Sequence, residues 1–371
     1  RNRPTTEEGR RSELGDSLPR MVKLTFSTLW NRFPVAHRST LTEIARRCGV
    51  HPSTVSRALA EDPKGVGAAT VERIRRIADE VGYSRNRAAA ALKTGRSNVI
   101  GVLVPRLTDF VLARIYEGCE AAAASRGFTT LVTSSDDIGA TRMDRVDRFL
   151  ASQVDGLIIC DSRFENDEVA RRLERENVPY VLANRRSVGQ VSVTLDDRRG
   201  GAAVGEHLYG LGHSQIGVVA GWDYASTCID RVEGLLSALH ERGLAVPATQ
   251  ILHGGVDAET GFSATTELLE RNRNISAIFA VNDFGAIGAM GAARAAGRTP
   301  GHDLSIVGFN DIPLAARLPI PLTSVKSDMN LMGSRAVELL IALMHGKVAD
   351  QSEVIDPILV ERESSHWSTA N

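Results

Sequence analysis

The chain has 371 residues, of which 43% are hydrophobic and 24% charged, and its formal net charge is −1. This length suggests two or three domains, and this composition is that of a globular protein rather than a fibrous or disordered one. The longest apolar runs, such as Val99–Val104, are of strand length, far short of the roughly 20 residues of a membrane span. No basic start followed by an apolar core indicates a secretory signal, so we expect a cytoplasmic protein without a membrane partner.

The four cysteines are widely spaced and form no CxxC motif: Cys48, Cys119, Cys160 and Cys228. Metal-binding and redox cysteines usually occur as closely spaced pairs. We therefore expect structural thiols, with no metal site, no disulfide and no cofactor.

The small net charge conceals an asymmetry along the chain. Residues 39–97 carry 11 Lys/Arg against 6 Asp/Glu, and the 38 residues before them carry 8 against 4. Residues 98–371 carry 25 against 35, a net charge of −10. A basic N-terminal module on an acidic body suits a polyanionic partner at one end, although a solvated surface can also be basic.

Residues 40–59 predict two short helices joined by a tight turn. The spacing i, i+3, i+4, i+7 gives the first helix one apolar face, at Leu41, Ile44, Ala45 and Cys48. Thr40 and Glu43 form a capping-box pattern at its start. Gly49 can end it in the left-handed conformation, and Pro52 suits the first position of the next helix.

The second helix separates apolar from polar residues. Val55, Ala58 and Leu59 can pack inward, which leaves the polar side chains outside. Two helices joined in this way form a helix-turn-helix unit, whose second helix enters the DNA major groove. An ordinary helical hairpin is the alternative, and this stretch alone leaves both open.

The remaining N-terminal segments suggest the domain boundaries. Residues 1–38 show no periodicity and are expected to be a disordered extension. We expect a helical DNA-binding domain over 39–83, whose third helix ends at Gly82, and a hinge over 84–97 that is too short to be a stable isolated helix. A two-lobed body over 98–365 and a tail over 366–371 complete the chain.

From Val99 onward, short aliphatic runs alternate with helix-length stretches. The predicted strands are Val99–Val104, Thr129–Thr133, Gly156–Cys160, Tyr180–Ala183, Ile216–Ala220, Ala277–Val281 and Ser305–Phe309. The predicted helices are Arg114–Ala124, Arg142–Ser152, Arg198–Leu211, Asp230–Glu241, Glu259–Arg271, Phe284–Ala296 and Leu331–Met344. This alternation predicts an α/β fold of parallel βαβ units, large enough for two sheets with a cleft between them. Ligands of such sheets bind at the carboxyl ends of the strands.

Several motifs occur in a recognisable order. They are LTEIARRCGVHPSTVSRAL at 41–59, NRAAAALK at 86–93, IGVLVP at 100–105, VDGLIIC at 154–160, EHLYGLGHSQIGVVAG at 206–221, AIFAVNDFGAIGAM at 277–290 and LSIVGFNDIPLAARLPIPLTSV at 304–325. Together they resemble the lactose/galactose-repressor (LacI/GalR) family of bacterial transcription regulators over about residues 40–365. The resemblance implies a helix-turn-helix domain, a hinge helix and a two-lobed body like that of periplasmic sugar-binding proteins.

The resemblance implies a homodimer that binds a roughly palindromic double-stranded DNA operator. It places Pro52, Ser53 and Arg57 at base edges, and Thr54 and Ser56 nearer the phosphates. This fits their chemistry, because an arginine can donate two hydrogen bonds to guanine and short hydroxyls suit either phosphate or base.

In the hinge, the resemblance makes Leu92 a wedge in the central minor groove. Asn86, Arg87 and Lys93 are the accompanying DNA-binding residues. An ordinary core leucine is the alternative for Leu92. His51 stands where the family usually has a better helix cap, so we expect it to contact phosphate instead.

In the body, the resemblance implies a small-molecule effector, such as a sugar or a sugar derivative. The matching positions are Arg106, Phe110, Asn184, Arg231, Asn282, Asp283, Asn310 and Asp311. Polar groups around an apolar floor are typical of such pockets. A helix N-cap is the alternative for Asp283 and for Asp311, and a surface salt bridge is the alternative for Arg231.

The sequence departs from the family in the expected pocket. Arg106 and Asn310 each replace a common aspartate, Phe110 is the only aromatic after the first strand, and Val256 stands where some relatives have an aromatic lid. Losing carboxylates and gaining an arginine could shift preference toward a ligand with an acid or phosphate group.

Two other classes of protein were considered. An enzyme is disfavoured, because the sequence lacks the GxSxG, P-loop, HExxH and GxGxxG motifs. His213 is expected to be a structural turn residue rather than a catalytic one. A solute-binding protein of the periplasmic type without DNA function is the closer alternative, against which stand the basic N-terminal module and the lack of a signal. We expect allosteric control, in which the ligand reorients the lobes and changes the spacing of paired hinges.

Overall fold

The computed structural model describes residues 40–60, 63–83, 96–346 and 352–365. The chain divides into two compact units, with the division between Asn86 and Arg87. The predictions for the N-terminal extension, the C-terminal tail and most of the hinge lie outside the described residues, as do those for Asn86, Arg87, Leu92 and Lys93.

The N-terminal unit consists of three short helices: α2 (Leu41–Cys48), α3 (Pro52–Ala58) and α4 (Ala68–Glu80). Its core is small and apolar, with Ile44, Val55 and Ile74 fully buried. The apolar spacing in the sequence is therefore what packs the three helices together.

The predicted ends of these helices are confirmed. The Thr40 side chain accepts a hydrogen bond from the Glu43 N–H at 3.3 Å, so Thr40 caps α2. Gly49 follows α2 with φ 63°, in the left-handed region that glycine adopts at low cost. Pro52 is the first residue of α3, where its missing N–H leaves no donor unpaired.

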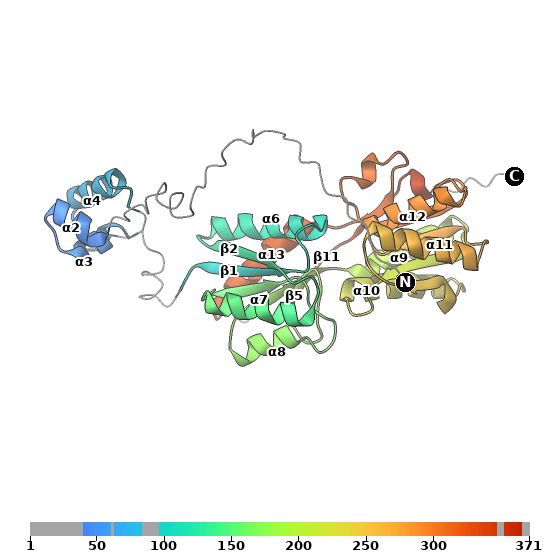
Figure 1. Cartoon of the computed structure of the whole chain (residues 1–371), viewed down its shortest axis with the longest axis horizontal. Coiled ribbons are helices and arrows are strands. Elements are labelled where there is room, and N and C mark those ends of the chain that lie inside the picture. The colour runs from blue at the N-terminus through green and yellow to red at the C-terminus, as the bar shows by residue number, and fades with distance from the viewer. Residues whose placement is uncertain (1–39, 61–62, 84–95, 347–351, 366–371) are drawn as a thin grey trace, which may run out of the picture. The chain divides into compact units, whose positions relative to one another are not determined.

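The first lobe of the body is a six-stranded sheet in the order β11-β5-β4-β3-β1-β2. Its strands are β1 (Val99–Val104), β2 (Thr129–Ser134), β3 (Gly156–Ile159), β4 (Tyr180–Ala183), β5 (Ser192–Leu195) and β11 (Glu353–Ile355). Its helices are α6 (Phe110–Ser125), α7 (Gly139–Ala151), α8 (Glu168–Arg175) and α13 (Met329–Met344). Helices α6 and α13 cover one face and α7 and α8 the other (Figure 1).

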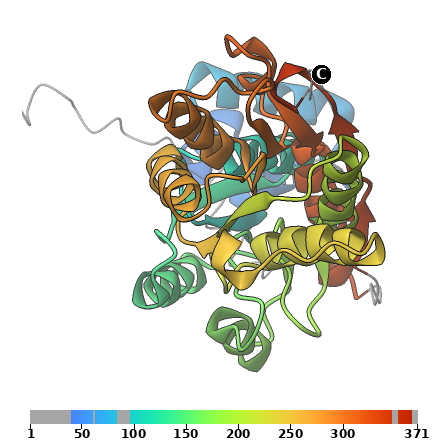
Figure 2. The ribbon, with the colours of Figure 1, turned by 90° about the vertical axis from the view of Figure 1, so that its right-hand side faces the viewer.

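The second lobe is a six-stranded sheet in the order β12-β10-β9-β8-β6-β7. Its strands are β6 (Ile216–Gly221), β7 (Ile251–His253), β8 (Ala277–Ala280), β9 (Ser305–Asn310), β10 (Thr323–Lys326) and β12 (Ile358–Val360). Its helices are α9 (Asp197–Gly210), α10 (Ser226–Glu241), α11 (Ala258–Arg271) and α12 (Asp283–Ala295). Figure 2 shows α11 and α12 on one side of this sheet and α9 and α10 on the other.

The chain passes between the lobes at three places: between β5 and α9, between β10 and α13, and between β11 and β12. The two lobes of parallel βαβ units confirm the predicted fold class, and β12 alone pairs antiparallel, with β10. Sequence periodicity missed α8 and the short strands β5, β7, β10, β11 and β12. The equally short β3, β4 and β8 were found because they are apolar throughout, whereas β5, β7, β10 and β11 contain polar residues and β12 has only three residues, too little pattern to be distinguished from a loop.

Three pairs of helices pack through reciprocal glycines. A Cβ on Gly201 of α9 would lie 2.0 Å from the Arg231 carbonyl oxygen, and one on Gly234 of α10 would lie 1.9 Å from that of Arg198. The same arrangement joins α11 to α12 and α6 to α13, through Gly261 with Gly288 and Gly118 with Gly333. Only glycine permits this approach of one backbone to another. In α9 and α10 the approach fixes the backbone that carries Arg231.

Candidate functional site

The polar residues of α3 stand outside the helical core. Ser53 and Arg57 are exposed, and Pro52, Thr54 and Ser56 are half-buried, whereas Val55 and Ala58 are buried. The Arg57 side chain donates a long hydrogen bond to its own helix, 3.4 Å from Nε to the Ser53 carbonyl oxygen. The guanidinium is therefore accessible to a partner.

His51 does cap α3, contrary to the expectation that it would be a poor cap. Its ring nitrogen Nδ1 accepts from the Ser53 N–H at 3.3 Å and lies 2.8 Å from the Ser53 hydroxyl oxygen. An imidazole nitrogen reaches the same backbone donor as a serine oxygen would.

A pocket lies between the two lobes, at the carboxyl ends of their parallel strands. The first lobe contributes Pro105, Arg106, Asp109, Val111, Leu112, Asn184 and Arg185. The second lobe contributes Trp222, Thr227, Cys228, Arg231, Val256, Val281, Asn282 and Asn310. Five of the predicted effector residues, Arg106, Asn184, Arg231, Asn282 and Asn310, thus come together in one place, which is where doubly wound sheets bind ligands.

Arg231 is held rigidly in the floor of this pocket rather than in a surface salt bridge. Its Nε lies 2.7 Å from Asp197 Oδ1, its Nη1 donates to the Val281 carbonyl oxygen at 2.7 Å, and its guanidinium lies 3.8 Å from the centre of the Phe309 ring. Burial raises the pKa of Asp197 to about 6, although the charge of Arg231 opposes that rise. At neutral pH the carboxylate is ionised and fixes the arginine.

Two aromatic residues here were missed in the sequence, Trp222 in the pocket lining and Tyr224 stacked on it. Trp222 and Tyr224 follow β6 directly and are stacked, with ring centres 5.8 Å apart. The guanidinium of Arg106 lies 5.0 Å from the Trp222 ring centre, and that of Arg185 lies 5.4 Å away. Both distances are within cation–π range. The available signal was their position just after an aliphatic run, where cleft residues are expected.

The side chains of Asn282 and Asn310 differ in their bonding. Asn282 caps α12, with its Oδ1 accepting from the Gly285 N–H at 2.9 Å and its Nδ2 donating to the Val256 carbonyl at 2.6 Å. Asn310 has φ 106° and is 6% exposed, and its Oδ1 has no hydrogen-bond partner in the described part of the chain.

Phe110, Asp283 and Asp311 do not line the pocket. Phe110 is the first residue of α6 and packs against the core. Asp283 accepts from the Ile312 N–H at 2.8 Å and from the Ser324 hydroxyl at 2.5 Å, and burial raises its pKa to about 7.

Neither aspartate is a helix N-cap, so that alternative is wrong for both. Asn282 is the cap of α12, and Asp283 is its first residue. Asp311 directly follows β9 with φ 51°, and its carboxylate forms an ion pair with Arg362 at 2.7 Å. Both carboxylates join segments that are distant in the sequence.

Polar contacts also fasten the lobes together beside the pocket. Arg186 of the first lobe forms a two-bonded ion pair with Asp230 on α10, at 2.7 and 3.0 Å. The Phe164 N–H donates to the Tyr224 carbonyl oxygen at 3.0 Å. These contacts form only while the lobes are close, so they depend on lobe orientation.

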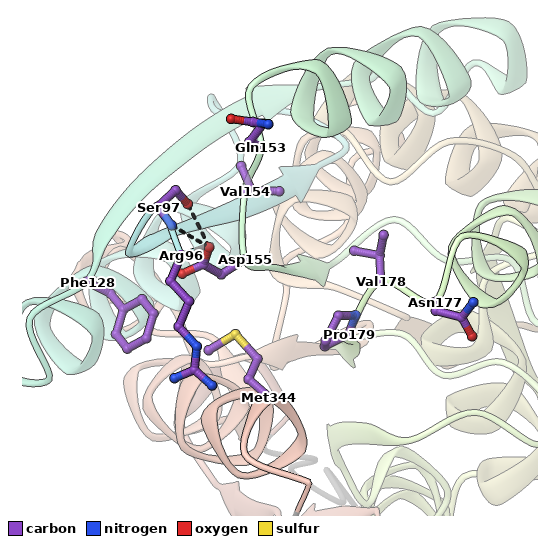
Figure 3. A pocket seen from close by; sticks show the side chains of 10 residues that line it. All are labelled: Arg96, Ser97, Phe128, Gln153, Val154, Asp155, Asn177, Val178, Pro179 and Met344. Carbon is purple, nitrogen blue, oxygen red and sulfur yellow. Dashed lines mark hydrogen bonds between the residues drawn. The ribbon is translucent and has the colours of Figure 1, made fainter. Parts of the chain in front are cut away.

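The opposite end of the first lobe anchors the last residue of the predicted hinge, Ser97, and the residue after it. The Asp155 carboxylate accepts from the Ser97 N–H at 2.7 Å and from the Ser97 hydroxyl at 2.9 Å (Figure 3). It also accepts from the Asn98 N–H at 2.8 Å. A second cavity, of about 530 Å³, adjoins this anchor at the amino ends of β1, β3 and β4, with Met344 and Phe128 in its lining.

Other features of the described residues are structural. All four cysteines are free and buried. His213 is buried between the Ser276 and Ser305 hydroxyls, and burial lowers its pKa to about 4. No group of His, Cys, Asp or Glu within the described ranges could hold a metal ion, and no helix there is long and apolar enough to cross a membrane.

The three-helix unit and the two-lobed body define a class of protein, a regulator with a nucleic-acid-binding domain and a ligand-binding domain. Residues 40–86 match the family model described as "Bacterial regulatory proteins, lacI family". Residues 97–362 match the model "Periplasmic binding proteins and sugar binding domain of LacI family". The chain belongs to the lacI family and is a DNA-binding transcriptional regulator with an effector-binding domain.

Similar proteins share nearly the whole of this arrangement. The repressor CytR of Escherichia coli (strain K12) is 30% identical over 330 residues, covering 88% of this chain and 96% of CytR. The regulator CelR of Thermobifida fusca is 32% identical over 340 residues, covering 88% and 98%. The lac repressor dimer bound to operator and the anti-inducer ONPF has a TM-score of 0.82 at 28% identity, covering 88% and 99%.

Proposed function

We propose that this regulator is a cytoplasmic repressor that binds a palindromic double-stranded DNA operator as a homodimer. A small molecule, a sugar or sugar derivative, binds between the lobes and changes operator affinity. The support comes from the family, from the similar lac repressor structure, which is a dimer on operator, and from the CelR structure, which is a complex with cellobiose. The match of residues 40–86 favours this function over that of a solute-binding protein.

The pocket between the lobes is the observation that carries the control mechanism. Its lining comes from both lobes, and the Arg186–Asp230 pair fastens the lobes beside it. Its volume is about 50 Å³. Small-molecule sites usually need roughly 300 Å³ or more, so a ligand binds only as the lobes or their side chains move apart. Ligand binding is thereby coupled to lobe orientation.

The coupling passes through the first lobe to the hinge. Asp155 holds Ser97 and Asn98 at the amino ends of the strands, so movement of this lobe displaces the end of the hinge. We infer that the hinge, residues 84–97, pairs on DNA with the hinge of the second protomer. Leu92 then inserts into the minor groove, and Asn86, Arg87 and Lys93 contact the DNA backbone. Whether a ligand induces or co-represses depends on which lobe orientation it prefers.

DNA binding by α3 is tested with the full chain and fragments of its own upstream region, by fluorescence anisotropy. Arg57→Ala is expected to weaken specific binding about tenfold to a hundredfold, since a bidentate base contact contributes roughly 1–3 kcal/mol. Arg76→Ala, an exposed position on α4, is the charge-matched control. Binding to no upstream fragment would refute the proposed function, and equal losses in the two variants would remove Arg57 from base recognition.

The effector site is tested with the same assay in the presence of candidate ligands. We expect Arg231→Ala to abolish the ligand response while operator binding without ligand persists. Because this change leaves Asp197 buried without its partner, the double variant Asp197→Asn/Arg231→Met provides a neutral replacement of the pair. A ligand response that survives in both variants would exclude Arg231 from the site.

A further inference from the structure

Arg106 differs from the other arginines of the pocket in its partners. Arg185 is paired with Asp137 at 2.8 and 3.1 Å, and Arg231 is paired with Asp197 at 2.7 Å. Arg106 is half-buried and lies over Trp222, yet in the described part of the chain its guanidinium has neither an ion pair nor a hydrogen bond. Arg106 therefore brings to the pocket N–H donors without an acceptor and a cation without an ion-pair partner among the described residues.

The nearest acids are engaged elsewhere. Asp109 caps α6, where its carboxylate accepts from the Val111 N–H at 2.9 Å. Asp257 caps α11, where its carboxylate accepts from the Thr260 N–H at 2.8 Å. Each is stabilised by a helix N-terminus, and neither forms an ion pair with Arg106. The Arg106 guanidinium can therefore bind an anionic group from outside the chain.

Asn310 is a second, independent sign of a ligand. It is 6% exposed, it lines the same pocket, and its Oδ1 is a buried acceptor without a donor among the described residues. Its φ of 106° lies in a region that residues other than glycine rarely adopt. An unsatisfied buried oxygen on a strained backbone is costly and is commonly found at functional sites. A hydroxyl donor of a ligand would satisfy it.

Trp222 supplies apolar surface to the same pocket as these two polar groups. Its ring is stacked on Tyr224, with an angle of 19° between the ring planes. The Arg106 guanidinium lies 5.0 Å from the centre of the Trp222 ring, so a ligand that contacts Trp222 brings its negative group within reach of Arg106.

We propose that the effector of this regulator is a polyhydroxylated anion, a sugar acid or sugar phosphate, whose negative group binds Arg106 and whose hydroxyl donates to Asn310 Oδ1. The inference rests on the proposed effector site and specifies its ligand class. The carboxylate and the phosphate share the chemistry that Arg106 recognises, and neutral sugars lack it.

The test compares matched ligands on the purified full chain at constant ionic strength. Thermal shift and isothermal titration are run with glucuronate, gluconate and glucose 6-phosphate, and with the neutral counterparts glucose and sorbitol. At least one of the anions is expected to raise the Tm and bind at least tenfold more tightly than its neutral counterpart. The carboxylate and phosphate members of the set identify which group is preferred.

Two variants test whether Arg106 and Asn310 contribute to the binding of the anionic ligand. Arg106→Gln is expected to weaken the preferred anion about tenfold to a hundredfold and to leave any neutral-sugar affinity unchanged. Asn310→Gly is expected to keep or raise the Tm without ligand, because glycine accepts the positive φ and removes the unsatisfied oxygen, and to weaken the ligand severalfold. Arg175→Gln, an exposed position on α8, is the control for loss of one positive charge.

The outcomes separate this inference from the proposed function. The inference is overturned if neutral sugars bind as tightly as the anions, if no anion of the set binds, or if Arg106→Gln and Arg175→Gln have equal effects. Operator binding by the unliganded chain is measured in the same preparations. That binding tests the proposed function, and it is unaffected by the identity of the ligand.

Discussion

The helical unit and the two-lobed body both form ion pairs between arginines and carboxylates, but in opposite environments. In the helical unit, Glu43 pairs with Arg46 and Arg47 at 2.8 Å each, and these side chains are 31%, 73% and 50% exposed. In the first lobe, Arg142 lies 3.2 Å from Asp161 and 2.7 Å from Asp167, and all three are at most 3% exposed. Water screens the first group of charges and is excluded from the second.

Charge determines structure where water is excluded from the ion pair. The exposed ion pairs of α2 add little to the stability of a helix that its apolar face and its caps already stabilise. The buried arginine joins α7 to the end of β3 and to the N-cap of α8, so its loss leaves carboxylates without compensation. The first lobe is therefore sensitive to single charges, and the helical unit is sensitive to its apolar core.

Removing Arg142 should give the largest effect. Arg142→Met is expected to destabilise the body by roughly 3–5 kcal/mol, because Asp161 and Asp167 stay buried without their cation. Chemical denaturation measures the change. Arg148→Met, on the same helix with its side chain 69% exposed, is the control and should change stability little. A similar small change in both variants would contradict the contrast between buried and exposed pairs.

The close contact of α9 with α10 should give the next largest effect. Gly201→Ala places a methyl group 2.0 Å from the Arg231 carbonyl oxygen, so the helices must separate. Overpacking of this kind costs roughly 1–3 kcal/mol. Calorimetry of the variant should show a lower Tm, and the ligand response should weaken because Arg231 moves. Gly210→Ala, on the same helix with open space around it, should keep or raise the Tm.

Protonation of Asp283 should give a smaller effect that depends on pH. Burial raises its pKa from 3.8 to about 7, and the hydrogen bonds from Ser324 and the Ile312 N–H oppose that rise. A raised carboxyl pKa means that the folded state holds the proton more tightly than the unfolded state. Its stabilising contribution is therefore complete below about pH 3.8 and is lost as pH rises through about 7.

Thermal unfolding between pH 6 and 8 tests this sign. The Tm of the wild-type chain should fall over that interval. The Tm of Asp283→Asn should fall less, because the amide side chain does not ionise. Asp197, whose pKa is about 6, titrates in both proteins, and His213, whose pKa is lowered to about 4, stays neutral, so the difference between the two slopes reports Asp283. Equal slopes for the two proteins would show that Asp283 does not titrate there.

The exposed pairs of α2 should give the smallest effect. Glu43→Gln is expected to leave the Tm of the chain and its operator affinity nearly unchanged, because Glu43 accepts no buried hydrogen bond and its partners are solvated. The measurement is thermal unfolding at low and high salt. A loss as large as that of Arg142→Met would refute the comparison between the two regions.

The sequence could predict much of the fold, because its signals are local. The predicted strands Val99–Val104 and Tyr180–Ala183 have the same bounds as β1 and β4 in the structure. Thr40, Gly49 and Pro52 mark helix ends through contacts and conformations within a few residues of themselves, so these signals can be recognised in the sequence. Five effector positions could be placed at one edge of the body, because parallel strands end together.

Contacts between distant residues were decided only by the tertiary structure. No spacing in the sequence shows that Asp283 bonds to Ser324 rather than to a ligand, that Trp222 lies beneath Arg106, or that Gly201 touches Arg231. Periodicity reports which face of an element is buried, whereas the partner of a charge or of a glycine depends on which elements the fold brings together. The sequence by itself therefore determined the elements and the family motifs, and the folded body decided which polar groups are bonded and which, like Asn310, are not.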